Sequence, residues 1–453
     1  MDTIVAISTA RGVGGIGIIR MSGKDCFKIL DKIFIPKSKE EIKGYKIKYG
    51  NIVEDNGKII DEVLVSYFVG PKSYTKENMC EINSHGGVAV EKRILEECIK
   101  NGARIAEPGE FTKRAFINGR IDLTQAEAVI DLINSKTETE RKASISQLEG
   151  VLSNRIKRIQ NRIMELMINI EVSIDYPEYE LEEKNNEEIM KEMNNIIQDL
   201  ERLSRSYNNA KTMKDGIKTA IIGKPNVGKS SLLNLLLNEE RAIVSDIEGT
   251  TRDTIEECVE IEGIKLKIID TAGIRNSSDE IEKIGVKKSI NITSSAELIF
   301  AIFDDSRALE EEDIKILELI KNKTAIIIIN KTDLKKNLID LNKIKKYNKN
   351  IVMFSTKDER GLLELYKKVK EIYEKQGIEE NNEEMITNLR QKQHIDKSIE
   401  IAEKIKKTIE KGETMDIISI QIKQILEELG SITGTNVSED IINEIFSKFC
   451  LGK

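Results

Sequence analysis

The sequence contains no tryptophan, and only 4% of its 453 residues are aromatic, so flat platforms on which nucleic-acid bases stack are scarce. Histidine occurs twice, and no two of the five cysteines form a C-x-x-C pair. We therefore do not expect a zinc site built from the usual cysteine and histidine ligands. The cysteines fit thiols of a reducing compartment; they are Cys26, Cys80, Cys98, Cys258 and Cys450.

Long apolar runs are absent as well. No run approaches the roughly 18 residues that a membrane span needs. The first residues, MDTIVAISTARG, lack the basic and then apolar pattern of a secretory signal peptide. From these absences we expect a soluble protein of the cytoplasm.

Positive charge is also in deficit, because 71 lysines and arginines face 78 aspartates and glutamates and leave a net charge of −7. An acidic chain is a poor general binder of nucleic acid, since phosphate contacts need a basic face. If the protein acts on RNA, the contact surface must be local or come from a partner. The hydrophobic fraction of 39% is ordinary for a globular protein. At roughly 150 residues per domain, the length predicts about three domains.

Residues 1–118 are predicted to be rich in β-structure. Short apolar stretches alternate there with glycines and Pro71, which is typical of strands and turns. One helix is predicted over Val88–Lys100, ended by Asn101 and Gly102. The predicted strands cover Ile4–Ile7, Ile16–Met21, Ile59–Val69 and Met79–Ile82.

Two distant segments, 119–215 and 379–453, show the spacing of amphipathic helices. Apolar residues from Ile145 to Ile170 recur every three or four positions, which predicts one long helix, and a polar helix follows over about 186–209. Similar stripes recur around 395–409 and 418–429. Because an apolar stripe needs a partner, we expect both segments to form one discontinuous helical domain. Two separate helical hairpins are the alternative.

The intervening segment, 216–378, alternates apolar strands with helical patterns. This order predicts a parallel, doubly wound α/β sheet, whose ligands bind at the carboxyl ends of the strands. The expected fold is thus a multidomain α+β protein with an inserted α/β domain. The predicted strands cover Ile217–Ile222, Leu266–Ile269, Leu298–Phe303, Ala325–Ile329 and Ile351–Phe354.

The most specific motif is G-x-x-x-x-G-K-S, which runs from Gly223 to Ser230 between a predicted strand and a predicted helix. Glycines let the backbone N–H groups of such a loop surround phosphates, and the helix N-terminus adds positive potential. Lys229 is expected to reach the β- and γ-phosphates, and the Ser230 hydroxyl is expected to bind Mg²⁺.

Further motifs follow in the order found in GTPases. Asp270-Thr271-Ala272-Gly273 offers a carboxylate near Mg²⁺ and an amide that can sense the γ-phosphate. The stretch Asn330-Lys331-Thr332-Asp333 matches the guanine-recognition motif, in which the Asp333 carboxylate accepts two N–H groups of guanine. Thr251, in Gly249-Thr250-Thr251, can complete the Mg²⁺ shell, and Ser355-Thr356-Lys357 is a candidate contact with the base. Together these motifs predict a guanine-nucleotide switch.

The catalytic glutamine of Ras-type GTPases is missing, because Ile274 occupies its place. Another group must orient the attacking water, and the residues leave Glu280 and Glu282 as alternatives. The transition state also needs a cation, which can be a metal ion or an arginine, Arg252 or Arg275.

Beyond these motifs, the chain resembles the MnmE (or TrmE) family of tRNA-modification GTPases over essentially all 453 residues. The resemblance rests on the inserted G domain together with stretches outside it. These stretches are Asp2-Thr3-Ile4-Val5-Ala6, Gly17-Ile18-Ile19-Arg20-Met21-Ser22-Gly23, Ser84-His85-Gly86-Gly87, Glu107-Pro108-Gly109-Glu110-Phe111-Thr112, Arg114-Ala115-Phe116, Gln125-Ala126-Glu127-Ala128 and Phe449-Cys450-Leu451-Gly452-Lys453.

The resemblance implies that residues 1–118 bind folate and mediate homodimerisation. It also implies a GTPase that works with an FAD-dependent partner, MnmG. Together the two would install an aminomethyl-type group on C5 of the wobble uridine of certain tRNAs. A formyl- or methylene-tetrahydrofolate would supply the carbon, and glycine or ammonia the nitrogen.

The resemblance also implies roles for single residues. Folate contacts would fall on Arg20, Glu81, Arg120 and Lys453, although the family usually has lysine at position 120. Cys450 is either a group in the modification reaction or a structural thiol. Glu282 would orient the attacking water. K⁺ ligands would be Asn226, Ser245, Ile247 and Thr250, and Mg²⁺ ligands would be Ser230 and Thr251.

The full predicted GTP site draws on all of these motifs. It comprises Asn226, Val227, Gly228, Lys229, Ser230, Ser231, Ser245, Asp246, Ile247, Glu248, Gly249, Thr250, Thr251, Asp270, Thr271, Ala272, Gly273, Asn330, Lys331, Asp333, Ser355, Thr356 and Lys357. A ribosome-assembly or regulatory GTPase that acts as a nucleotide-dependent binding module is the competing interpretation. The sequence shows no KH-type loop or basic stripe that such a module would use on RNA.

Overall fold

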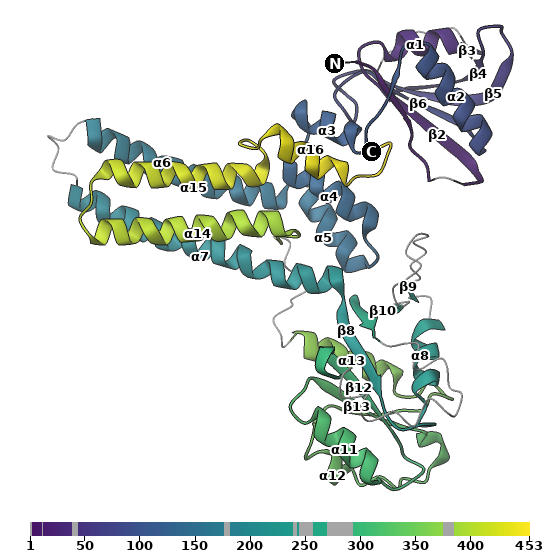
Figure 1. Cartoon of the computed structure of the whole chain (residues 1–453), viewed down its shortest axis with the longest axis vertical. Helices are drawn as coiled ribbons and strands as arrows, with labels where there is room; N and C mark the ends of the chain where they lie inside the picture. The colour runs from purple at the N-terminus through teal and green to yellow at the C-terminus, as the bar shows by residue number, and fades with distance from the viewer. Residues whose placement is uncertain are drawn as a thin grey trace. The chain divides into compact units, whose positions relative to one another are not determined.

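The computed structural model describes residues 2–10, 12–38, 44–175, 182–238, 242–243, 257–269, 293–374 and 385–453 (Figure 1). The chain forms two compact units. The first contains Met1–Ile130, Gln147–Ile197 and Lys397–Lys453, and the second contains Asp131–Ser146 and Gln198–Asp396. The division into domains 1–118, 119–215 with 379–453, and 216–378 stays a prediction.

A seven-stranded sheet begins the first unit, with the strand order β3-β4-β5-β6-β2-β1-β7. The strand pairs are antiparallel except for β1 and β7, which run parallel. Helices α1 (Cys26–Ile33) and α2 (Val88–Lys100) cover one face (Figure 1). The strands are β1 (Ile4–Ile7), β2 (Gly14–Ser22), β3 (Phe34–Pro36), β4 (Lys46–Val53), β5 (Ile59–Phe68), β6 (Met79–Gly86) and β7 (Arg104–Ile105).

The other face of this sheet is exposed over strands β4 and β5. In β5 the side chains of Val63 and Val65 are buried under the helices, whereas Leu64 between them is 49% exposed. Strand β4 reverses the usual pattern, because Lys48 is buried while Tyr49 is exposed. The Lys48 ammonium lies 5.8 Å from the ring centroid of Tyr67. This reversal explains why hydrophobicity alone did not predict β4.

The helices correct one prediction. The helix predicted through residues 145–170 is interrupted, because α5 (Glu138–Leu148) ends before α6 (Val151–Asp175) begins. Gly150 lies between them with a φ of +88°, a left-handed conformation that ends a helix. The side-chain amide of Gln125 donates to the carbonyl of Leu148 at 2.9 Å, which satisfies the end of α5.

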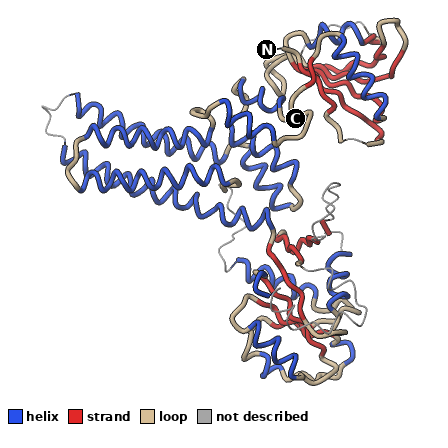
Figure 2. The backbone as a smooth tube through the Cα atoms, viewed as in Figure 1, coloured by secondary structure: helices blue, strands red, loops and turns tan. Residues whose placement is uncertain are grey.

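Helix α6 packs against α15 (Met415–Thr433), although about 250 residues separate them in sequence (Figure 2). The apolar stripes of both helices are buried, with Ile163 and Ile425 fully inaccessible. Glu171 of α6 accepts a hydrogen bond from Ser419 at 2.8 Å and pairs with Lys423 at 3.2 Å. The other long helices are α7 (Glu182–Asp215) and α14 (Leu389–Glu410), and shorter ones are α3 (Glu110–Ile117), α4 (Leu123–Asn134) and α16 (Glu439–Ser447).

The second unit contains a seven-stranded sheet with the order β14-β13-β12-β8-β11-β10-β9. It confirms an α/β sheet, but the sheet is mixed rather than wholly parallel. Strands β11 and β10 form an antiparallel hairpin through Glu262 and Gly263, whose positive φ angles, +50° and +78°, suit a tight hairpin turn. The strands are β8 (Ile217–Ile222), β9 (Ala242–Ile243), β10 (Glu257–Ile261), β11 (Ile264–Ile268), β12 (Leu298–Asp304), β13 (Ala325–Asn330) and β14 (Ile351–Met353).

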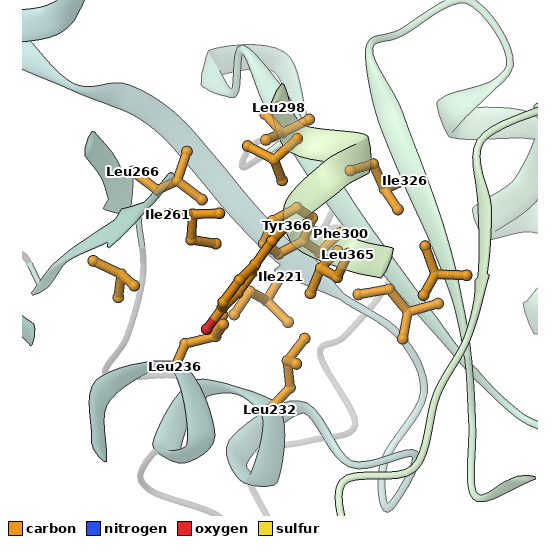
Figure 3. Packing of buried hydrophobic residues seen from close by; sticks show 14 of the residues in the cluster. Ile221, Leu232, Leu236, Ile261, Leu266, Leu298, Phe300, Ile326, Leu365 and Tyr366 are labelled. Carbon is orange, nitrogen blue, oxygen red and sulfur yellow. The ribbon is translucent and has the colours of Figure 1, made fainter. Parts of the chain in front are cut away.

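Helices cover both faces of this sheet. Alternate residues of β12 point to opposite sides, so that Phe300 joins one core cluster and Phe303 joins the other. Figure 3 shows the first cluster, where Leu232 of α8 and Tyr366 of α13 pack against the strands. Helices α8 (Lys229–Asn238) and α13 (Leu362–Glu374) lie on that face, and α11 (Glu311–Ile320) and α12 (Leu341–Ile344) lie on the other.

Across the described ranges, none of the helices combines the length and the apolar character that crossing a membrane requires.

The last residues of the chain pack onto the start of α3. The backbone N–H of Gly109 donates to the carbonyl of Cys450 at 3.3 Å, and that of Phe111 donates to the carbonyl of Lys453 at 3.2 Å. Gly109 has a φ of +69°, and a Cβ there would lie 2.6 Å from the carbonyl oxygen of Phe446. Glycine at 109 is thus required both by its conformation and by the close approach of residues 446–453, here called the C-terminal segment.

We predict that Gly109→Ala destabilises the first unit by about 3 kcal/mol, because left-handed strain adds to a backbone clash. Gly412→Ala is the matched control. Gly412 has nearly the same φ, +68°, but a Cβ at that position would have no neighbour within 4 Å. The control isolates the strain, which is about 1 kcal/mol. Denaturant unfolding of both variants measures the difference, and equal losses would contradict the role assigned to the C-terminal segment.

Candidate functional site

The phosphate-loop motif connects the end of β8 to the start of α8. Its backbone takes positive φ angles at Gly223, Asn226 and Gly228, which are +155°, +63° and +106°. A Cβ on Gly228 would lie 2.2 Å from the side-chain nitrogen of Asn330. A Cβ on Gly223 would lie 2.5 Å from the carbonyl oxygen of Ile302. Both glycines are therefore required by close neighbours as well as by conformation.

Lys229 is the first residue of α8, and its side chain folds back over the loop. Its ammonium donates to the carbonyls of Gly223 at 3.0 Å and Lys224 at 2.8 Å. Ser230 and Ser231 follow in the first turn of α8, where backbone N–H groups are not used within the helix. A cation beside the N–H groups of a helix N-terminus forms an anion-binding site, and the loop geometry suits phosphates.

The carboxyl ends of neighbouring strands meet beside the loop. Asn330, at the end of β13, is fully buried. Its side-chain nitrogen donates to the carbonyl of Val227 at 2.7 Å, and its side-chain oxygen accepts from the backbone N–H of Thr356 at 3.1 Å. One amide therefore joins three motifs that lie far apart in the sequence.

The remaining parts of the base-recognition motif are held by the loop after β14. Thr332 donates its hydroxyl to the carbonyl of Phe354 at 2.8 Å. The hydroxyl of Ser355 donates to the carboxylate of Asp333 at 3.1 Å and accepts from the N–H of Asp358 at 3.2 Å. These contacts fix Asp333 at the sheet edge where the sequence predicts the base, while Lys357 is exposed.

Asp304, at the end of β12, is a member of this cluster that the sequence did not single out. Its carboxylate pairs with the ammonium of Lys331 at 2.7 Å. Burial by itself raises the pKa of Asp304, but hydrogen bonds from Lys331 and Ser306 outweigh burial and lower the pKa overall. The pair holds Lys331 beside Asp333. The sequence could have indicated Asp304, because it directly follows the predicted strand Leu298–Phe303 and ligands of such sheets bind at the carboxyl ends of strands.

Two of the predicted metal ligands, Ser230 and Asn226, lie within the described residues. The Ser230 hydroxyl, a hard oxygen ligand, lies directly after Lys229 at the phosphate loop. Asn226, predicted to bind K⁺, is exposed at the loop with its left-handed backbone. Several predicted residues lie outside the described residues, namely Ser245, Asp246, Ile247, Glu248, Gly249, Thr250, Thr251, Arg252, Asp270, Thr271, Ala272, Gly273, Arg275, Glu280 and Glu282.

A separate cavity of about 540 Å³ lies in the first unit. All four residues predicted to contact folate line it, namely Arg20, Glu81, Arg120 and Lys453. The remaining lining residues are Tyr45, Phe68, Pro71, Lys72, Ser73, Tyr74, Lys76 and Met79. Five cationic side chains thus face one carboxylate among three aromatic rings, which favours an anionic ligand that carries an aromatic ring.

Arg20 and Glu81 are direct partners across strands β2 and β6. The Arg20 guanidinium lies 2.8 and 2.9 Å from one carboxylate oxygen of Glu81, and it also donates to the carbonyl of Gly452 at 2.9 Å. Sheet register brings the two side chains to one face, and the C-terminal segment adds the third partner. The other oxygen of Glu81 has no hydrogen bond that joins it to Arg20, so the carboxylate keeps accepting capacity.

Arg120 and Lys453 line the same cavity. The Arg120 guanidinium lies 4.7 Å from the ring centroid of Tyr74, a cation–π distance. Burial lowers the pKa of the Lys453 amine, and the positive charge of Arg20 lowers it further, against the opposing effects of Glu81 and Cys450. Cys450 itself is exposed and does not line the cavity.

Sequence reasoning missed Tyr74 and the lysines of the loop before β6. The signal was present, since Lys72, Tyr74 and Lys76 place an aromatic ring between two cations. Lys76 donates to the carbonyl of Gly119 at 2.9 Å, which ties this loop to the residue before Arg120. The loop therefore positions part of the cavity wall.

Comparisons with known proteins match the whole chain. Residues 3–120 match the family described as GTP-binding protein TrmE N-terminus, and residues 123–450 match the MnmE helical domain. A protein of Acetivibrio thermocellus named tRNA modification GTPase MnmE is 48% identical, with 100% of this chain and 99% of that protein covered. A protein of the same name from Finegoldia magna is 46% identical, with both chains covered completely.

Among solved structures, Era in complex with MgGDPNP and a fragment of 16S ribosomal RNA is 30% identical. It covers 34% of this chain and 56% of its own, with a TM-score of 0.27.

We predict that Asn330→Ala destabilises the second unit by about 2 kcal/mol, because it removes two hydrogen bonds of a fully buried amide. The exposed Asn342 of α12 is the control, and Asn342→Ala is expected to change stability by less than about 0.5 kcal/mol. Denaturant unfolding without nucleotide measures both. If the two variants unfold alike, Asn330 does not hold the three motifs together.

Proposed function

The chain belongs to the MnmE family of tRNA modification GTPases, and we propose that it uses GTP hydrolysis to drive folate-dependent modification of the wobble uridine of certain tRNAs. The product would carry an aminomethyl-type group on C5. The chain is a GTP-hydrolysing enzyme of this family. The observation that carries the folate proposal is the single cavity lined by Arg20, Glu81, Arg120 and Lys453.

The cavity residues suit each part of a folate. Bound tetrahydrofolate supplies a one-carbon unit at the formyl or methylene level. The Glu81 carboxylate can accept from the amide and amino edge of a pterin ring, and Arg20 holds that carboxylate in place. Tyr74 offers a ring face, and the cations Arg120 and Lys453 suit the carboxylates of the folate tail.

At the nucleotide site, this chain's residues bind and orient GTP. Lys229 and the N–H groups of the loop hold the phosphates, and Asp333 accepts from guanine while Ser355 keeps it in place. Mg²⁺, held by Ser230 and Thr251, would neutralise phosphate charge. We assign the orientation of the attacking water to Glu282.

We further propose that K⁺ supplies the cation that the transition state needs, with Asn226, Ser245, Ile247 and Thr250 as its ligands. Asn226 supports this assignment, because its left-handed backbone places an exposed amide side chain at the phosphate loop. The ion would take the position that an arginine occupies in other GTPases.

A homodimer is also proposed, through the open face of the first sheet. The cross-strand neighbours Tyr49 and Leu64 are 48% and 49% exposed on that face, and Ile47 is 64% exposed. In the next row of the register, Ile47 lies beside Ser66, which pairs with Glu81. The apolar surface therefore continues into the row that carries the cavity residues, and a second copy would cover it.

The remaining partners are proposed from membership of the family. We propose tRNA as the substrate and an FAD-dependent protein of the MnmG type as the second subunit. A partner that supplies much of the RNA-binding surface agrees with the net charge of −7. The cytoplasm is the proposed location. Cys450, exposed within the C-terminal segment, stays a candidate for the modification reaction.

We predict that the full chain binds 5-formyl-tetrahydrofolate and that Arg20→Ala and Glu81→Ala each weaken binding by about tenfold or more, since each removes a charged partner. Arg93→Ala is the matched control, because Arg93 forms an ion pair with Glu54 at 2.9 Å outside the cavity. Isothermal titration measures the affinities. A folded, GTP-competent protein that does not bind folate would favour the ribosome-assembly interpretation.

We also predict that GTP turnover in K⁺ exceeds turnover in Na⁺ by about tenfold or more at matched ionic strength, because an ion that stabilises transition-state charge must fit its ligands. Asn226→Ala should lose this preference while it still binds GTP. Phosphate release in the two salts measures the ratio. Equal rates for the wild-type protein would remove the K⁺ assignment.

A further inference from the structure

Lys224 is a residue of the phosphate loop to which no role has been assigned so far. Its side chain is only 9% exposed, although the proline and asparagine that follow it are exposed. Its ammonium donates a hydrogen bond to the carboxylate of Glu310. It also lies 3.7 Å from a carboxylate oxygen of Glu312 and 3.9 Å from one of Asp313. A buried lysine therefore faces three carboxylates at the start of α11.

The carboxylates are fixed in place by the helix that they begin. Glu310 is the N-cap of α11, and its side chain accepts from the N–H of Asp313. In return, the Asp313 carboxylate accepts from the N–H of Glu310 at 3.0 Å. The hydrogen bond and positive charge of Lys224 lower the pKa of Glu310, with a weaker contribution from Arg307. Glu310 and Asp313 are thus held beside the phosphate loop by reciprocal hydrogen bonds.

The backbone of Lys224, in contrast to its side chain, contacts the phosphate-binding lysine directly. Its carbonyl accepts the ammonium of Lys229 at 2.8 Å, and the adjacent carbonyl of Gly223 accepts it at 3.0 Å. Carboxylates this close to the loop repel a polyphosphate, since the interaction of like charges at short range is only partly screened. A cation between them and the loop reduces that repulsion.

We propose that Lys224 is a positioning residue for nucleotide binding, which neutralises the acidic start of α11 so that the phosphate loop can accept GTP. This inference rests on GTP as the ligand of the second unit. It adds a function for the first variable residue of the loop and links α11 to nucleotide affinity. Because Glu310 and Glu312 are 60% and 57% exposed, a partner that binds them would change GTP affinity through Lys224.

The test compares Lys224→Met, which keeps the length of the side chain but removes its charge, with Lys224→Arg. GTP affinity is measured by equilibrium binding of a non-hydrolysable analogue to the full chain, and KM and kcat are measured in K⁺. We expect Lys224→Met to weaken binding and raise KM by about tenfold, with kcat at saturation within about twofold of wild type. Lys224→Arg should bind as the wild type does.

The same substitution in a variant without the two glutamate charges distinguishes a lost charge from simple structural damage. In Glu310→Gln with Glu312→Gln, we expect Lys224→Met to cost less than about threefold in affinity, because only the Asp313 carboxylate is left for Lys224 to offset. Lys368→Met is the control, since Lys368 pairs with Glu371 at 2.8 Å on α13 and should leave GTP affinity unchanged.

Two results would overturn the inference. One is a Lys224→Met variant with wild-type affinity, and the other is a loss of the same size in both backgrounds, which would mark Lys224 as a structural tether. A wild-type protein that binds no GTP would instead contradict the proposed function, so the two failures are distinguishable.

Discussion

The cavity of the first unit depends on one hydrogen-bond acceptor, the backbone carbonyl of Gly452. It accepts from the Arg20 guanidinium at 2.9 Å and from the Ser8 hydroxyl at 3.1 Å, so that the last residues of the chain complete a cavity begun by strands β2 and β6. A Cβ at residue 452 would lie 2.5 Å from the carbonyl of Ile7. Lys453 reaches the cavity because Gly452 fits against the backbone of Ile7.

The nucleotide site of the second unit is likewise held by contacts between distant segments. Parallel strands bring their carboxyl ends to one edge, and the buried amide of Asn330 joins the loop at Val227 to the backbone of Thr356. Beside it, Lys331 is held by Asp304, and Asp333 by Ser355. The ligand-binding groups are thus oriented by contacts among themselves. Lys224 extends this network to the acidic start of α11.

Local sequence patterns predicted much of the architecture. The spacing of apolar residues identified α2 and β8 with the observed bounds, and the glycines of the phosphate loop predicted its place between β8 and α8. Errors arose where a neighbour overrides the local pattern. Gly150 ends α5 because Gln125 satisfies the carbonyl of Leu148, and β4 escaped prediction because the buried Lys48 packs on Tyr67. Gln125 and Tyr67 lie outside the stretches of sequence whose structure they decide, so a local pattern does not include them.

The sequence by itself determined the G-type nucleotide motifs, their order, and the pattern of two helical segments on either side of an α/β segment. These features depend on residues within one turn or one strand, whose backbone preferences are local. Only the tertiary structure decided which distant side chains share a site. The contact between Arg20 and Gly452 spans 432 residues, and the placement of Lys224 against Glu310 spans 86. Such pairs are set by strand register and helix packing, which no local pattern encodes.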